Sequence, residues 1–292
     1  TPIVNSGGTI QIHAATGEVF DSVTSRLQDD LYFSDRVPRS SGGQTFNSDV
    51  LDVVFNTVVF HPRGRLSFGQ TYYITVDAGM ITDSLGTPFS VAQSDNWTFT
   101  VRQQPPASSD TYLLAADGSG DFCSLEGVLE ALPDGSPTTR VVDVGPGVYP
   151  GIVRMRESNV RFQGAGIDQS VFAPKNSTLM NGSREGIVLT GSDVTFENLT
   201  IFNTYLKDSN GQQAEALAVS PGSERVFLDK VHLRSHQDTL RVDGPSVYMS
   251  GGKISGSTDP LWGTGAFYCD GCELSSRTSG HAFVVARSTR GF

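Results

Sequence analysis

An eight-residue pattern occurs four times in the second half of the chain, and its register restricts the fold to a narrow class. Apolar or small residues take its first, third, sixth and eighth places, a polar residue the fourth, and a polar residue or glycine the fifth. The copies align without gaps at residues 194–201, 226–233, 247–254 and 267–274. An α-helix does not alternate on both sides of a polar bend, whereas a strand, a corner and a second strand do. The pattern therefore predicts a parallel β-solenoid, with the first place of each copy in one interior ladder: Val194, Val226, Val247, Phe267.

The last copy contains Cys269 and Cys272, which have the CxxC spacing of metal and redox sites. In the register of the pattern they occupy the third and sixth places, where the other copies carry mostly apolar residues. No second pair of ligands accompanies them, and Cys123 lies far away in the sequence. We therefore interpret them as buried core thiols.

A polar, proline-rich segment at residues 104–110 has the composition of a linker. Before it, short alternating segments are broken by glycine-containing turns, which indicates β structure over residues 1–103. Residues 69–76 and 96–100 resemble the closing strands of the Ig-like domains that bacterial secreted and surface enzymes carry as spacers. We expect an Ig-like β-sandwich accessory domain at residues 1–103 and the solenoid at residues 111–292.

The charge balance excludes one class of partner. Acidic side chains outnumber basic ones by 31 to 21, for a formal net charge of −10. Nucleic-acid binding needs a concentrated basic surface, so it is not expected. No apolar run approaches the roughly 20 residues that cross a bilayer, so no membrane span is expected either.

Two aspartates follow the pattern at equal distances. Asp238 lies five residues after Leu233, and Asp259 lies five residues after Ile254. Equal phase in successive coils would stack the two aspartates one interstrand spacing apart, roughly 4.8 Å between their backbones. Packing alone does not favour such a pair, since repulsion raises the pKa of one carboxyl and leaves the other charged. That division suits a general acid and a nucleophile; the alternative is two solvated acids on a turn.

The residues around these aspartates resemble the motifs of pectin methylesterases. Residues 237–240 (Gln-Asp-Thr-Leu) and 259–263 (Asp-Pro-Leu-Trp-Gly) are similar to the two aspartate motifs of that family, and residues 213–217 (Gln-Ala-Glu-Ala-Leu) to its glutamine motif. The resemblance covers most of residues 111–292. It implies a right-handed parallel β-helix in an all-β chain, in a monomeric protein that is secreted or held at the cell surface.

The resemblance also implies a reaction, the hydrolysis of the C6 methyl esters of pectin (homogalacturonan) with release of methanol. Neither a metal nor a cofactor takes part. Asp259 would be the nucleophile, and Asp238 the acid that gives its proton to the departing methoxide, released as methanol, and then the base that activates water. The amides of Gln213 and Gln237 would donate hydrogen bonds to the oxyanion, since an amide NH₂ donates while staying neutral.

Three further residues are candidates for substrate binding. Trp262 either stacks on a sugar ring or forms part of the core or wall. Arg241 stands where tyrosine is common in the family and would lie beside the substrate. Glu215 falls in the phase of the two aspartates, where many members carry valine. It is either a substrate contact or a solvated acid at the end of the row.

Two departures from the family keep a second interpretation open. Pro260 replaces a usual phenylalanine, and the motif of the family's catalytic arginine has no counterpart, since neither Arg287 nor Arg290 matches it. We expect the natural protein to continue beyond Phe292. The alternative function is a weakened or inactive pectin-binding or cell-surface β-helix protein. Polysaccharide lyases and polygalacturonases share the architecture, but the glutamine–aspartate pairing does not meet their needs.

Overall fold

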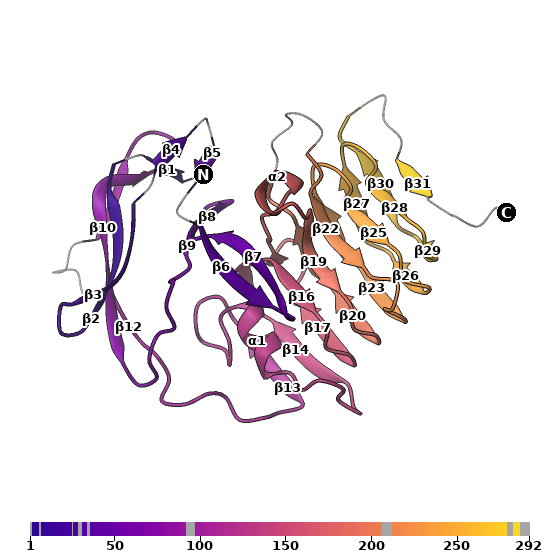
Figure 1. Ribbon diagram of the computed structural model, residues 1–292, viewed down its shortest axis with the longest axis horizontal. Coiled ribbons are helices and arrows are strands. Elements are labelled where there is room, and N and C mark those ends of the chain that lie inside the picture. Colours follow the sequence, from indigo (N-terminus) through magenta and orange to yellow (C-terminus); the bar gives the residue numbers. More distant parts are fainter. Residues whose placement is uncertain are drawn as a thin grey trace. The chain divides into compact units, whose positions relative to one another are not determined.

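The computed structural model of the 292-residue chain describes residues 2–5, 7–24, 26–28, 31–33, 36–91, 97–205, 212–278 and 283–286 (Figure 1). The chain divides into two compact units. The first comprises Thr1–Pro38 and Asn47–Ala107, and the second comprises Arg39–Phe46 and Ser108–Phe292. The linker at residues 104–110 and the domain limits drawn from it stay predictions.

The first unit is built on an antiparallel sheet with strand order β1-β10-β2-β3. These strands are β1 (Ile3–Val4), β2 (Thr9–Ala14), β3 (Val19–Thr24) and β10 (Thr71–Thr82), and β10 also pairs with β11 (Pro88–Val91) and β12 (Thr98–Thr100). Two hairpins follow β3 in this unit: β4 (Arg26–Gln28) with β5 (Leu31–Phe33), and β8 (Leu51–Val54) with β9 (Thr57–Phe60). A third hairpin, β6 (Arg36–Ser41) with β7 (Gln44–Asp49), lies between them in the sequence, and its residues Arg39–Phe46 belong to the second unit. Val50 and Leu51 join Ile10, Val23 and Val76 in one buried cluster, so the β8–β9 region covers one face of the sheet.

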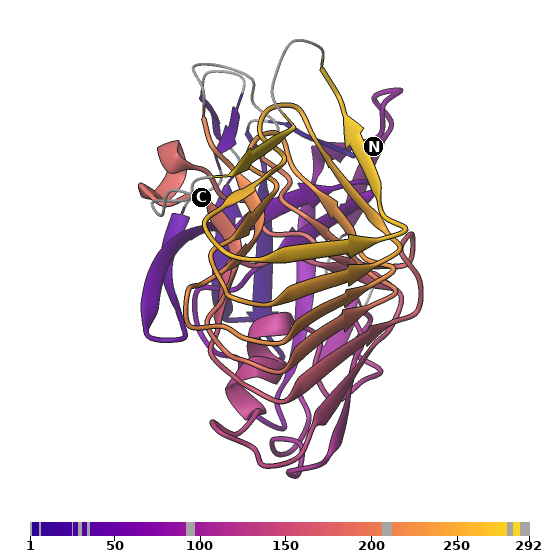
Figure 2. The same cartoon turned by 90° about the vertical axis from the view of Figure 1, so that its right-hand side faces the viewer.

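The second unit is a right-handed parallel β-helix, as predicted, and Figure 2 views it toward its last coils. In its described residues, three sheets run along the axis and every pairing between neighbouring strands is parallel. The first sheet contains β13 (Thr111–Leu114), β14 (Arg140–Val144), β17 (Val160–Gly164), β20 (Val194–Glu197), β23 (Val226–Asp229), β26 (Val247–Ser250) and β29 (Phe267–Asp270). The second contains β15 (Gly147–Tyr149), β18 (Ser170–Phe172), β21 (Thr200–Phe202), β24 (His232–Arg234), β27 (Lys253–Gly256) and β30 (Glu273–Ser276). The third contains β16 (Val153–Met155), β19 (Glu185–Leu189), β22 (Glu215–Val219), β25 (Leu240–Val242), β28 (Leu261–Gly263) and β31 (Val284–Ala286).

The predicted interior ladder is confirmed. Val194 pairs with Val226, Val226 with Val247, and Val247 with Phe267 in consecutive strands of the first sheet. The three valines are buried and Phe267 packs partly against the same core. The hydrophobic effect therefore acts along the whole axis, because each coil covers the apolar residues of the coil before it.

The fifth place of the pattern has a conformational reason for being polar or glycine. Its occupants all take a left-handed backbone conformation: Asn198 (φ 49°), Lys230 (φ 50°), Gly251 (φ 61°) and Gly271 (φ 66°). Positive φ turns the chain sharply from the first sheet into the second, and it excludes β-branched residues there. Each of these corners thus contains a residue with positive φ, and the third contains a second one, Gly252 (φ 77°).

The two cysteines of the last coil differ from the prediction. Cys269 and Cys272 form a disulfide, and both are partly exposed, so the interpretation as buried thiols is wrong. They flank the corner at Gly271, which brings their Cα atoms to 5.9 Å, within the range that a disulfide spans. Cys272 still packs partly against the core, as its sixth place in the pattern requires.

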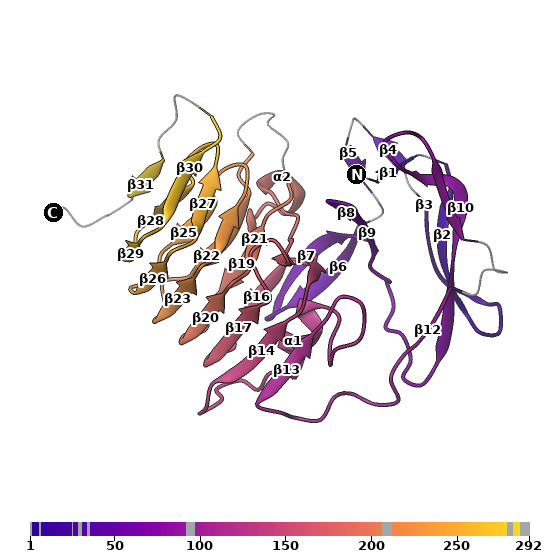
Figure 3. The ribbon, with the colours of Figure 1, turned by 180° about the vertical axis from the view of Figure 1, so that it is seen from behind.

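Helix α1 (Leu125–Ala131) lies beside the first coil of the solenoid, near β13 and β14 (Figure 3). Ser124 caps it by accepting a hydrogen bond from the backbone N–H of Gly127, and Leu125, Val128 and Leu129 are buried in the solenoid core. The helix therefore covers the apolar end that the first coil would otherwise expose. In the described parts of the chain, no helix has the length and apolar character needed to cross a membrane.

Candidate active site

The candidate residues occupy one corner of the solenoid, where the chain passes from the second sheet into the third. Gln213 lies just before β22, Asp238 just before β25, and Asp259 just before β28. The coils are in register here. The backbone N–H of Asp238 donates to the carbonyl of Thr258 at 3.0 Å, and that of Ala214 donates to the carbonyl of Gln237 at 3.3 Å. The structure therefore brings Asp238 and Asp259 to equivalent places in consecutive coils, with Gln237 directly before Asp238. Gln213 lies in the preceding coil, one place further back than Gln237, because Ala214 is the residue in register with Gln237.

Both aspartates have a left-handed backbone, with φ of 60° at Asp238 and 47° at Asp259. Asp tolerates this conformation better than most residues, because its short polar side chain forms local hydrogen bonds. The corner places the two residues differently with respect to solvent: Asp238 is 3% exposed, whereas Asp259, Gln213 and Gln237 are partly exposed. Of the two carboxyl groups, Asp259 is the one that a ligand reaches more easily.

Pro260 does not interrupt the coil. It is buried, and its carbonyl accepts a hydrogen bond from the backbone N–H of Leu240 at 2.8 Å. A proline lacks only its own N–H, so it can follow Asp259 at the start of a strand. Proline at position 260, in place of phenylalanine, therefore preserves the backbone of the site.

Arg184 also belongs to this site, although the sequence patterns did not single it out. The short helix α2 (Thr178–Asn181) ends at Gly182, whose left-handed conformation (φ 70°) directs the chain toward β19. The backbone N–H of Thr178 donates to the carbonyl of Gln213 at 3.1 Å, which ties α2 to the start of β22. Arg184 follows this turn and extends to the two coils that come after it.

The guanidinium of Arg184 makes polar contacts with three of the predicted site residues. Its Nη1 donates to Oε1 of Gln213 in a short hydrogen bond, and lies 3.3 Å from Oδ2 of Asp238. Its Nε lies 2.8 Å from Oε1 of Glu215. The register of the coils marks this residue: Glu185 pairs with Glu215 one coil later, so Arg184 directly precedes β19 as Ala214 directly precedes β22.

Glu215 is fully buried, which excludes the solvated acid considered above. Burial raises its pKa to about 8, and the charges of Glu185 and Asp238 act in the same direction, while Arg241 and Arg184 oppose them. Its contacts are the two arginines, with Nη1 of Arg241 at 3.4 Å from Oε1. Its predicted role as a substrate contact stays a prediction.

Arg241 is held by carboxylates on several sides. Its guanidinium lies 2.8 Å from Glu185, 3.4 Å from Glu215 and 3.4 Å from Asp243. Burial acts against its charge, but Glu215 and Glu185 outweigh burial and raise its pKa. Burial would raise the pKa of Glu185, yet backbone hydrogen bonds and Arg241 hold it below the usual value. The positive charge of Arg241 is therefore compensated within the protein.

Trp262 forms part of the wall beside these arginines. It is 9% exposed and pairs in register with Arg241. Guanidinium carbons lie 4.5 Å (Arg184) and 5.5 Å (Arg241) from its ring centroid, within the range of cation–π interactions. Its use as a sugar platform stays a prediction.

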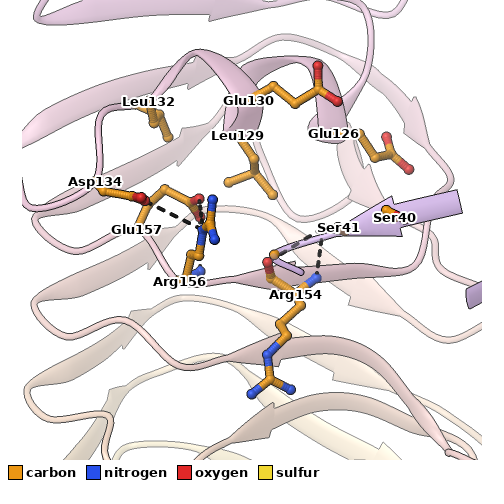
Figure 4. Close-up of a pocket in the computed structure, with 11 residues that line it drawn as sticks. Ser40, Ser41, Glu126, Leu129, Glu130, Leu132, Asp134, Arg154, Arg156 and Glu157 are labelled. Atoms are coloured by element: carbon orange, nitrogen blue, oxygen red, sulfur yellow. Dashed lines mark hydrogen bonds and ion pairs between the residues drawn. The ribbon is translucent and has the colours of Figure 1, made fainter. Parts of the chain in front are cut away.

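A pocket at the other end of the solenoid, beside α1, does not include any of these residues (Figure 4). Its lining includes Glu126, Arg154, Arg156 and Glu157. Among the residues that the structure describes, no group of three or more His, Cys, Asp or Glu side chains is arranged to hold a metal ion. Arg287 and Arg290 lie outside the described residues.

The fold and the site together define a parallel β-helix protein with stacked aspartates beside two side-chain amides. Residues 111–290 match the family model described as Pectinesterase, and residues 14–101 match that of a bacterial Ig-like domain. The chain belongs to the pectinesterase family, and the predicted resemblance is confirmed in both parts of the chain.

Relatives among known proteins agree with this assignment. Pectinesterase 31 of Arabidopsis thaliana is 25% identical over 192 residues, which cover 61% of this chain and 59% of that protein. A pectinesterase of Daucus carota is 27% identical over 178 residues, covering 58% and 53%. The chain thus spans little more than half of the lengths of these relatives.

Solved structures agree on the fold. Pectin methylesterase PemA from Erwinia chrysanthemi superposes with a TM-score of 0.51 at 24% identity, covering 58% of this chain and 56% of that one. A pectin methylesterase in complex with a hexasaccharide has the same TM-score, identity and coverage. These likenesses show the right-handed β-helix.

Proposed function

We propose that this chain carries the ester-hydrolysing site of a pectin methylesterase, which hydrolyses the C6 methyl esters of homogalacturonan. Family membership supports the reaction class. The observation that carries the assignment of residues is the equivalence of Asp238 and Asp259 in consecutive coils, beside Gln213 and Gln237. Related proteins are pectin methylesterases, one of them in complex with a hexasaccharide.

The proposed reaction has two steps. The partly exposed carboxylate of Asp259 attacks the ester carbonyl, and the side-chain amides of Gln213 and Gln237 donate to the oxyanion that forms. Protonated Asp238 gives its proton to the departing methoxide, which leaves as methanol. Asp238, now charged, takes a proton from water, whose oxygen attacks the acyl-enzyme. Free Asp259 and a galacturonic acid group result, without any cofactor, and this group loses its proton to solvent as a carboxylate forms.

Substrate and location follow from this reaction. Pectin is a polymer outside the cell, so the protein is proposed to be secreted or held at the cell surface. Trp262, Arg241 and Glu215 are proposed to shape the substrate side of the site, Glu215 through its two arginines because it is fully buried. The Ig-like domain is proposed to be a spacer.

One observation favours the alternative, a weakened or inactive pectin-binding protein. Arg184 lies 3.3 Å from Asp238 and stabilises its charged form, whereas the first step needs a proton on this carboxyl. The alternative predicts that pectin binds and that no methanol is released.

Methanol and acid release test the proposal against this alternative. The full-length protein is incubated with highly methylated pectin, with polygalacturonate and with acetylated, unmethylated pectin. We expect methanol and acid in equal amounts from the first substrate and neither from the second. Acetate release from the third without methanol from the first would contradict the proposed substrate. Pectin binding without any product would establish the alternative.

A further inference from the structure

Arg184 contacts a proposed oxyanion-hole amide, the proposed acid–base group and Glu215 together. It comes from the coil before Gln213, and its side chain is 20% exposed. We infer that Arg184 is a positioning residue that fixes the amide of Gln213 for oxyanion binding. The inference rests on the proposed function and deepens it.

The guanidinium of Arg184 determines which end of the Gln213 amide faces it. An amide side chain presents a carbonyl oxygen on one side and an NH₂ on the other, and the two can exchange places by rotation. A guanidinium has donors only, so it can face only the oxygen of the Gln213 amide. With Oε1 occupied, the NH₂ group of Gln213 is the part left to meet a developing negative charge. Arg184 thus selects the amide orientation that an oxyanion hole requires.

The position of Arg184 is itself fixed before any ligand arrives. Nε is paired with Glu215, which is fully buried, and the guanidinium lies 4.5 Å from the centroid of the Trp262 ring. The carboxyl group of Glu215 beside Nε and the aromatic ring near the guanidinium restrict the movement of the group. Donors that are oriented in advance need no rearrangement in the transition state, which is the condition for effective charge stabilisation.

The same nitrogen links two coils. Nη1 of Arg184 contacts both Oε1 of Gln213 and Oδ2 of Asp238, the latter at 3.3 Å. A displacement of the guanidinium would therefore disturb both groups. Because Arg184 acts through them, its effect should appear in the rate of the chemical step and not in pectin affinity.

A double-mutant cycle tests the inference in the full-length protein. Arg184→Met, Gln213→Ala and the double variant are compared with wild type by methanol release from methylated pectin, after thermal melts show that each is folded. Gln213→Ala is expected to lower kcat by about 10²–10³, the effect of losing one oxyanion donor. Arg184→Met should lower kcat at least tenfold with KM changed less than about threefold. The double variant should lose at least tenfold less than the product of the two single effects.

Two further variants control this result. Arg184→Lys keeps a donors-only cation and should retain more activity than Arg184→Met. Arg161→Met removes an exposed arginine that pairs with Glu197 on the first sheet, and should stay within about twofold of wild type.

Three outcomes overturn the inference. The first is a double variant whose loss of kcat lies within threefold of the product of the two single losses. The second is a change confined to KM. The third is an Arg184→Lys variant that is no more active than Arg184→Met. An inactive wild-type protein would instead refute the proposed function, and the positioning role with it. If Arg184→Met does not fold, a double-mutant cycle of Arg184→Lys, Gln213→Ala and their double variant tests the inference by the same comparison of kcat losses.

Discussion

Asp238 and Asp259 occupy equivalent places in consecutive coils and share a left-handed backbone, with φ of 60° and 47°. The hydrogen bond from Asp238 N–H to Thr258 carbonyl, at 3.0 Å, holds the two turns in register. Two acids in equivalent positions nevertheless differ in burial, since Asp238 is 3% exposed and Asp259 is open in part to solvent. This difference is the physical basis for assigning them different roles.

Asp238→Asn should lower kcat for methanol release by about 10²–10⁴, because asparagine neither donates nor accepts the proton that general acid–base catalysis transfers. The substitution keeps the shape of the side chain and suits the left-handed conformation. Asp270→Asn, at an exposed corner of the same solenoid, is the matched control and should retain full activity. An Asp238→Asn variant within threefold of wild type would remove Asp238 from the mechanism.

Glu215 should make the stability of the protein depend on pH. Its pKa is raised from 4.5 to about 8 in the folded protein, so the folded state binds the proton more tightly than the unfolded state does. The associated stability is complete below pH 4.5 and is lost as the pH rises through about 8. The charged groups that face this carboxyl are Arg184, Arg241, Glu185 and Asp238.

Thermal melts of Glu215→Gln and wild type between pH 4.5 and 9 measure this dependence. The difference in Tm, variant minus wild type, should rise with pH by about 3 °C or more, since 1 kcal/mol corresponds to about 2–4 °C in a domain of this size. Glu273→Gln, whose side chain is 63% exposed, should show a flat difference. A Glu215→Gln difference that stays level or falls with pH would contradict the account.

Gly251→Ala should destabilise the solenoid by about 1 kcal/mol, because alanine is strained in the left-handed conformation of the corner (φ 61°). Space is not the obstacle, since an added Cβ would meet only Lys230 Cγ at 3.7 Å. Gly222→Ala is the matched control, because an added Cβ meets nothing within 4 Å there and φ is not positive. Urea denaturation of both variants measures the difference. Equal midpoints would show that the corner conformation does not limit stability.

The coils could be predicted because the residues that set their register lie close together in the sequence. Each copy of the pattern places Val194, Val226 or Val247 inside, and each turns at a residue that tolerates positive φ. The equal phase of Asp238 and Asp259 follows from counting along such coils. These features depend on residues close together in sequence, so a local sequence pattern is enough to predict them.

Arg184 and the disulfide could not be predicted in the same way. Arg184 lies before the first copy of the pattern and 54 residues from Asp238, and its contacts depend on the turn after α2. Its placement is a property of packing between coils. The pattern places Cys269 and Cys272 correctly in the register, but it does not show that the corner brings the two sulfur atoms within bonding distance.

The measurement that tests the central claim most directly is methanol release from highly methylated pectin by the full-length protein and its Asp259→Asn variant. We expect wild type to release methanol and the variant to lose several orders of magnitude in rate, as loss of a nucleophile does. Pectin affinity should persist in the variant, since the amides and Trp262 are unchanged. An Asp259→Asn variant that releases methanol at a rate near that of wild type would contradict the assignment of the nucleophile.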